Sequence, residues 1–204
     1  MKFKLMLSLI LLQITTSIFA QDKALINMEK PLPYHEIPAT PAEYTAANVA
    51  ARMIDGLGYR YYWATEGLTE ENLKYQPSED SRTMIETLDH LLGLSGTILN
   101  GSKNEPNIRP TEALELTWEE KRKRTLQNFK MASDLLKSAE EVDLIDKNII
   151  FQRGEKTSEF PYWNMLNGPI ADAIWHAGQI VAFRRAAGNP LNPKVNVFMG
   201  KTKE

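Results

Sequence analysis

The chain has 204 residues, no Cys and a formal net charge of -2 at pH 7. Its length suffices for one domain with a sizeable core, and the absence of a basic excess argues against nucleic acid as a partner. Without Cys there are no disulfides and no lipidated cysteine, so the fold depends on its core and on any metal that it binds.

Residues 1–20 have the pattern of a secretory signal peptide. Lys2 and Lys4 precede a short, largely apolar stretch, residues 5–14, and Ala20 is the expected cleavage site. The apolar stretch is too short for a membrane span. We therefore expect export to the periplasm or the exterior, without stable insertion into a membrane.

Residues 21–40 are rich in proline and predict an extended arm that lies on the domain or leaves it. His35 lies in this arm, where we expect it to be exposed rather than to bind a metal. The first helix is expected from about Ala42 to Glu66, with Thr40 as its cap and Pro41 at its first position. Its apolar face is expected to consist of Val49, Met53, Leu57, Tyr61 and Ala64.

Two further helices follow. Ser81 is the expected cap of the second, which runs from about Arg82 to Asn100 and stops at Gly101. After a polar loop at 102–115, the sequence from Thr117 to Glu120 has the pattern of a capping box and starts a third helix that ends near Ser138.

The residues before the last helix have a pattern of strands and a turn rather than of a helix. Residues 149–151 favour a strand, 153–156 a turn and 158–160 a returning strand, which predicts a short β-hairpin or an irregular insertion. The last helix is expected over residues 168–190. Together these patterns predict an all-α four-helix bundle over residues 41–190, followed by a tail at 191–204.

The last helix carries two residues that can bind a metal. Asp172 and His176 lie one turn apart, and His90 on the second helix is the credible third ligand. Imidazole and carboxylate suit zinc, iron, nickel or manganese, and three protein ligands leave positions for water or substrate. Alternatively, Asp172 is a surface residue and His176 a hydrogen-bonded core histidine.

Four residues near the proposed metal ligands each have a functional and a structural interpretation. Glu86 either orients His90 or is exposed, and Gln179 either contacts a ligand or ties its helix to a neighbour. Tyr62 and Trp175 either shape a pocket or pack at the edge of the core. The two arginines of the last helix, Arg184 and Arg185, are assigned to interaction with the helix dipole.

A family resemblance adds to this reading. The sequences His176–Ile180 and Phe183–Arg185 resemble the last-helix signature of the DinB-like superfamily, and Met84–His90 resembles its second-helix motif. The resemblance implies an up-up-down-down four-helix bundle that binds a divalent metal through His90, Asp172 and His176. Asp172 departs from the family, which usually has His at that position.

Two functions remain open at this point. The first is a metal-dependent enzyme that acts on a small molecule, as a hydrolase or as a thiol-dependent transferase, which the resemblance implies. The second is a non-catalytic bundle that binds a metal or a small ligand. Because an exported protein meets fewer cytosolic thiols, hydrolysis is at least as plausible as thiol transfer. Relatives often form dimers, so a homodimer is also an expectation.

Overall fold

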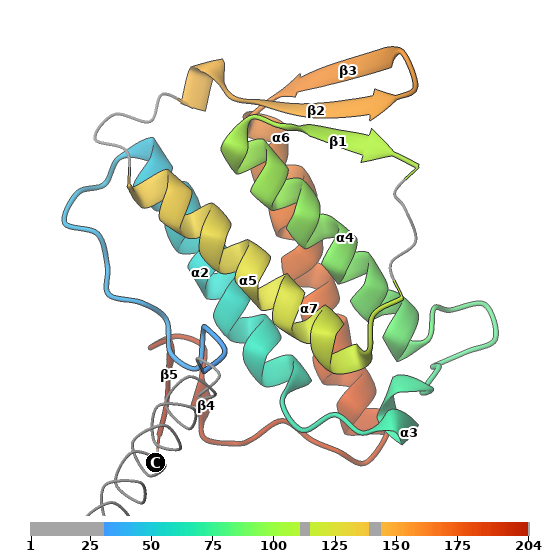
Figure 1. The fold of residues 1–204 in the computed structure, drawn as a ribbon. Helices are drawn as coiled ribbons and strands as arrows, with labels where there is room; N and C mark the ends of the chain where they lie inside the picture. Colours follow the sequence, from blue (N-terminus) through green and yellow to red (C-terminus); the bar gives the residue numbers. More distant parts are fainter. Residues whose placement is uncertain (1–30, 111–114, 139–143, 204) are drawn as a thin grey trace, which may run out of the picture. The chain divides into compact units, whose positions relative to one another are not determined.

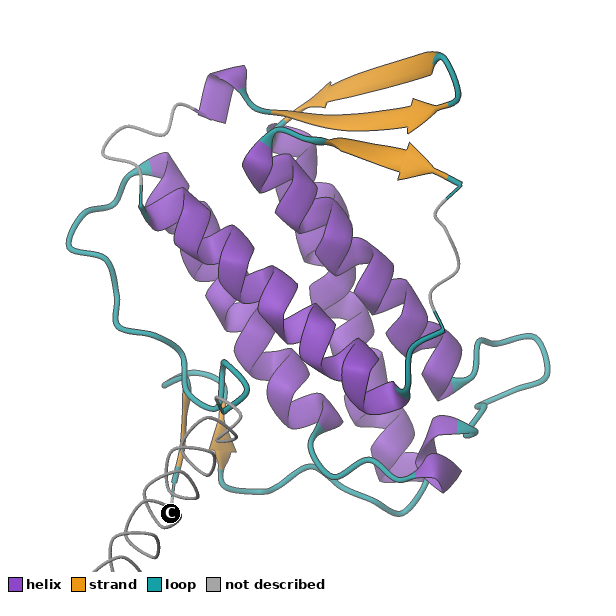
Figure 2. Cartoon of the chain, viewed as in Figure 1, coloured by secondary structure: helices purple, strands orange, loops and turns teal. Residues whose placement is uncertain are grey.

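Four long helices dominate the computed structural model (Figures 1 and 2). The model describes residues 31–110, 115–138 and 144–203, so the expected signal peptide lies outside the described residues. The fold is mainly helical, at 55%, as the predicted bundle implies, but it contains two small sheets and is not purely all-α. The four long helices are α2 (Ala46–Thr65), α4 (Met84–Lys103), α5 (Trp118–Lys137) and α7 (Ala171–Ala186).

The helices pack as a bundle in which α5 and α7 each contact both α2 and α4. Contacts between side chains show that α4 and α5 are parallel. Lys121 Nζ lies 2.7 Å from Asp89 Oδ1, and further along both helices Asn128 donates a hydrogen bond of 2.9 Å to Ser95 Oγ. The long connection between α4 and α5 returns the chain to the end of the bundle where α4 began.

Helix α2 runs against α5, because Arg122 near the start of α5 donates to Thr65 at the end of α2, while Lys137 at the end of α5 pairs with Asp55. Helix α7 runs back along α4 (Figure 1). The four long helices therefore run up, down, down and up. This corrects the up-up-down-down order that the family resemblance implies.

Threonine caps set the starts of the first three long helices. Thr45, Thr83 and Thr117 each accept a hydrogen bond from the third residue of their helix. The capping box at Thr117 is confirmed. The expected caps at Thr40 and Ser81 are wrong, because a side chain with the right chemistry lies nearer the apolar repeat in both places.

The inward face of α2 also differs from the prediction at its amino-terminal end. Leu57, Tyr61 and Ala64 are buried, as expected, whereas Val49 and Met53 are 47% and 37% exposed. Helices α5 and α7 flank α2 on two sides, so its buried surface is wider than one stripe and includes residues such as Ala50 and Ile54 that a single periodic line misses.

The predicted hairpin is confirmed. Strands β2 (Asn148–Arg153) and β3 (Lys156–Pro161) pair antiparallel around Gly154, which has a positive φ of 59°. The polar loop after α4 contains an unpredicted strand, β1 (Pro106–Arg109), which pairs parallel with β2. It is only four residues long and begins with Pro106, so a periodicity argument does not detect it.

The described part of the arm lies on α2, anchored by Tyr34. This residue is 4% exposed, its hydroxyl donates to Asp55 Oδ1 at 3.0 Å, and its ring fills the space where Gly58 lacks a side chain. His35 is exposed, as expected. After α7, the short strands β4 (Val195–Asn196) and β5 (Lys201–Thr202) form a second small sheet beside the arm, where Ile37 donates to Gly200.

Buried tyrosines predict instability at alkaline pH. Burial raises the pKa of Tyr34, helped by the Asp55 carboxylate, and burial also raises the pKa of Tyr61. Both tyrosines therefore stay protonated in the folded protein above about pH 10, where unfolded tyrosine ionises, and each contributes stability that is complete below that pH. We expect the free energy of unfolding to fall above pH 10 by about 1.4 kcal/mol per pH unit for each tyrosine.

Urea titrations at several alkaline pH values measure this loss. Tyr34→Phe removes one of the two titrating groups and should flatten the slope. A free energy of unfolding that stays constant well above pH 10 would contradict the prediction.

No described helix is long and apolar enough to cross a membrane.

Candidate metal centre

A kinked segment precedes the helix that carries two of the proposed ligands. The last helix does not start at Gly168 as one continuous element: α6 (Trp163–Met165) is followed by η2, a π-helical segment at Leu166–Ile170, and then by α7. Gly168 has non-helical angles, φ -96° and ψ -106°, and the next residue, Pro169, lacks a backbone N–H. Asp172 therefore lies in the first turn of α7, directly after the kink.

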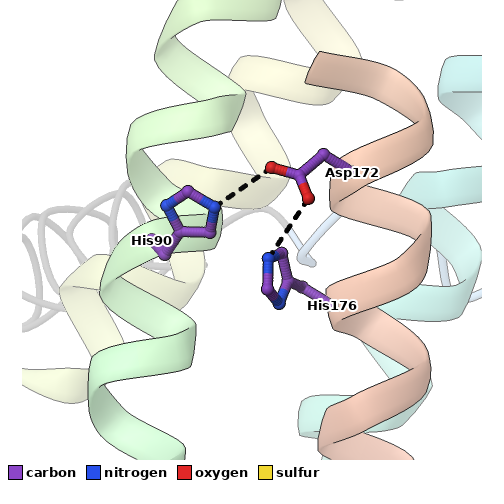
Figure 3. A group of neighbouring side chains, drawn as sticks. All are labelled: His90, Asp172 and His176. Atoms are coloured by element: carbon purple, nitrogen blue, oxygen red, sulfur yellow. Dashed lines mark hydrogen bonds and ion pairs between the residues drawn. The ribbon is translucent and has the colours of Figure 1, made fainter. Parts of the chain in front are cut away.

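His90, Asp172 and His176 converge between α4 and α7 (Figure 3). His90 Nε2 lies 3.1 Å from Asp172 Oδ2, and His176 Nε2 lies 3.2 Å from Asp172 Oδ1. The two imidazole rings are nearly perpendicular, at 87°, with centroids 4.6 Å apart. The carboxylate thus bridges the two rings, with one oxygen near one nitrogen of each.

The three side chains are accessible from solvent to different degrees. The His90, Asp172 and His176 side chains are 33%, 39% and 15% exposed. His176 is hydrogen-bonded, as the alternative of a core histidine expects, but it is not fully buried, and Asp172 is not an isolated surface carboxylate. A partly open site of this kind allows water or a small molecule to approach the ligands.

Each ring nitrogen of His176 has an oxygen atom beside it. Its Nε2 faces Asp172 Oδ1, and its Nδ1 lies 2.6 Å from Gln179 Oε1. A neutral imidazole has only one N–H and cannot donate to both oxygens. Three arrangements satisfy these contacts: a protonated ring, a Gln179 amide turned to donate from its nitrogen, or a cation bound at Nε2.

The donor set fits a metal ion. One ligand atom from each of the three residues lies within 4.8 Å of the other two. Two atoms bound at about 2.1 Å to one tetrahedral ion are about 3.4 Å apart. His90 Nε2 lies 3.1 Å from Asp172 Oδ2 and His176 Nε2 lies 3.2 Å from Asp172 Oδ1, so each imidazole nitrogen is near this separation from one carboxylate oxygen. Gln179 provides the outer contact typical of metal-binding histidines, which fixes the ring orientation.

Other residues considered for the site lie elsewhere. Glu86 does not orient His90: its carboxylate accepts hydrogen bonds from the backbone and hydroxyl of Thr83, which lower its pKa. Trp175 is 72% exposed, which does not suit the wall of a closed pocket. Tyr62 contacts an aromatic and cationic group at the end of α2 that contains His35, Trp63 and Arg122.

Removal of the Gln179 amide should weaken metal binding without abolishing it. We expect Gln179→Leu to lower affinity for Zn²⁺ about 10-fold, because the His176 ring loses the partner that fixes its orientation. Competition with a chromophoric chelator measures the affinity. Gln127→Leu, at an exposed position on α5, is the matched control and should bind as the wild type does. Equal affinity in Gln179→Leu and the wild type would show that the contact has no role in the site.

Comparisons of the chain with protein-family models, with curated proteins and with solved structures find no match. The resemblance to the DinB-like superfamily therefore rests on the sequence motifs, the helical bundle and the His-Asp-His group.

Proposed function

We propose that the protein binds one divalent metal ion through His90, Asp172 and His176. The observation that carries this proposal is the convergence of two imidazoles on one carboxylate, with one ligand atom from each residue within 4.8 Å of the other two. A cation at Nε2 of His176 satisfies the carboxylate and the imidazole together and leaves the Nδ1–H to donate to Gln179 Oε1. The neighbouring His90 adds a second imidazole to the same carboxylate.

Two imidazoles and one carboxylate suit zinc, iron, manganese or nickel, and the carboxylate shifts preference toward the harder ions. A metal bound there would supply a Lewis acid that lowers the pKa of a bound water or polarises a carbonyl. Three protein ligands and a partly exposed site leave room for a small substrate, which is the pattern of catalytic rather than structural sites.

On this basis we propose an exported, DinB-like, metal-dependent enzyme, with hydrolysis of a small molecule as its reaction. Thiol-dependent transfer uses the same type of site and is the second reaction to test. The non-catalytic alternative is a bundle that holds the metal or a small ligand. Amino-terminal sequencing of exported protein tests the export, with Gln21 as the expected first residue.

Elemental analysis tests the metal site. Wild-type protein purified without chelators should contain roughly one ion per chain, and His176→Ala should contain none. His35→Ala is a matched control, because His35 is the remaining histidine of the chain and lies in the arm. Wild-type protein without metal, or His176→Ala with undiminished metal, would contradict the proposal.

A substrate screen separates the enzyme from the binding module. Turnover of an ester, amide or phosphoester that requires metal and is lost in His176→Ala supports the hydrolase. Turnover that also requires an added thiol supports the transferase. A metal-loaded protein that turns over nothing in either screen favours the non-catalytic alternative.

A further inference from the structure

A cavity lies on a different face of α4 from the one that carries His90. It has a volume of about 630 Å³ and lies between α4, α5 and β1. Neighbouring residues of α4 contact different helices: Asp89, which lines the cavity, pairs with Lys121 of α5, whereas His90 contacts Asp172 of α7. Cavities of this volume are typical of small-molecule sites.

Two glycines open the floor of this cavity. A side-chain carbon added to Gly93 or Gly96 would meet no atom within 4 Å. Close contacts explain Gly58 and Gly101, because Tyr34 of the arm and Met165 of α6 fill the space of their missing side chains, but no such contact explains Gly93 and Gly96. Glycine in the middle of a helix is less favourable than alanine, so their effect here is to leave space above the helix.

The floor beside the glycines is apolar and the rim is basic. Leu92 and Leu99 line the cavity from α4. The charge of Lys121 is neutralised by Asp89 at 2.7 Å, and Arg124 adds a positive charge to the rim.

Arg124 is available to a ligand. Its side chain is exposed and makes no hydrogen bond or ion pair with the residues that the structure describes. A guanidinium presents paired N–H donors that match a carboxylate. The side chains of Asn100 and Asn128 add polar groups to the same wall.

We propose that this cavity binds a small organic carboxylate. The apolar part of the ligand lies over Gly93 and Gly96, and its carboxylate pairs with Arg124. This site is independent of the metal centre and requires no metal.

Octanoate and octanol are suitable probes, because they have the same chain length and differ in charge. Binding is followed by NMR through the amide signals of Gly93 and Gly96, in the His176→Ala variant as well as the wild type. We expect octanoate to shift both signals, with similar affinity in the two proteins, and octanol to bind at least about tenfold more weakly.

Two variants test the contacts, each with a matched control. Arg124→Gln should weaken octanoate about tenfold, and Gly96→Leu should abolish binding by filling the floor. Arg185→Gln and Gly178→Leu make the same changes at exposed positions on α7 and should bind as the wild type does. Gly96→Ala should remain folded and bind octanoate, because the added methyl group enters open space.

Several results would overturn the proposal. They are an absence of octanoate binding, equal binding of octanol, binding that survives Gly96→Leu, and binding that is lost in His176→Ala. The last result would place the carboxylate at the metal centre instead. Each outcome is separate from the elemental analysis, so failure of one proposal does not decide the other.

Discussion

Replacement of Asp172 by alanine is expected to lower the affinity of the protein for Zn²⁺ by more than about 100-fold. Changes to the outer contacts of metal ligands alone cost 10–100-fold, and Asp172 is the residue that contacts both imidazoles. Its loss removes one ligand and the negative charge that balances the ion. Chelator competition at fixed pH measures the change.

Two further variants sharpen this prediction. Asp172→His restores the three-histidine set that the resemblance implies, and we expect it to retain tight metal binding with a shift toward zinc over harder ions. Asp146→Ala, at an exposed position in the short 3₁₀ helix before β2, is the matched control. If Asp172→Ala binds metal as tightly as Asp146→Ala, the carboxylate is not a ligand.

Replacement of Arg184 by alanine is expected to destabilise the fold by about 3 kcal/mol. The side chain is 4% exposed, and its guanidinium donates to the carbonyl oxygens of Trp63 and Ala64 and to both oxygens of Asn189. The variant leaves these buried acceptors without a partner. It also disconnects the end of α7 from the end of α2, where Asn189 continues the network to Gly67.

Urea denaturation with Arg185→Ala as the control measures this effect. Arg185 is the next residue along α7 and is exposed, so its loss should change the free energy of unfolding by less than about 0.5 kcal/mol. The sequence assigned both arginines to the dipole of their own helix. The structure instead places Arg184 at the carboxyl end of another helix, α2. Equal destabilisation by the two variants would contradict this difference.

Local patterns predicted much of the bundle, because the helices depend on signals within a few residues. The capping box at Thr117 and the turn at Gly154 both specify their elements locally, and both were confirmed. Strand β1 and the burial of Tyr34 depend on partners far along the chain, so no local pattern revealed them. The kink before α7 had a local signal in Gly168-Pro169, which the strong apolar pattern of the helix concealed.

The residues of the candidate site were also predicted where local spacing was sufficient. The spacing of Asp172 and His176 placed both on one helix face, and the second helix offered His90. Gln179 follows His176 by three residues, so the sequence spacing alone could have predicted its contact with the imidazole ring. The proposed contact between Glu86 and His90 was a wrong reading of the sequence. Glu86 lies three residues after Thr83, and its carboxylate accepts a hydrogen bond from the Thr83 backbone N–H in the capping box of α4.

Anomalous X-ray scattering from crystals of the wild-type protein grown with Zn²⁺ tests the central claim most directly. The proposal predicts one strong peak between α4 and α7, about 2.0–2.2 Å from an imidazole nitrogen of His90, an imidazole nitrogen of His176 and a carboxylate oxygen of Asp172. A map with no peak at this position, while the His90–Asp172–His176 hydrogen bonds remain in place, would contradict it.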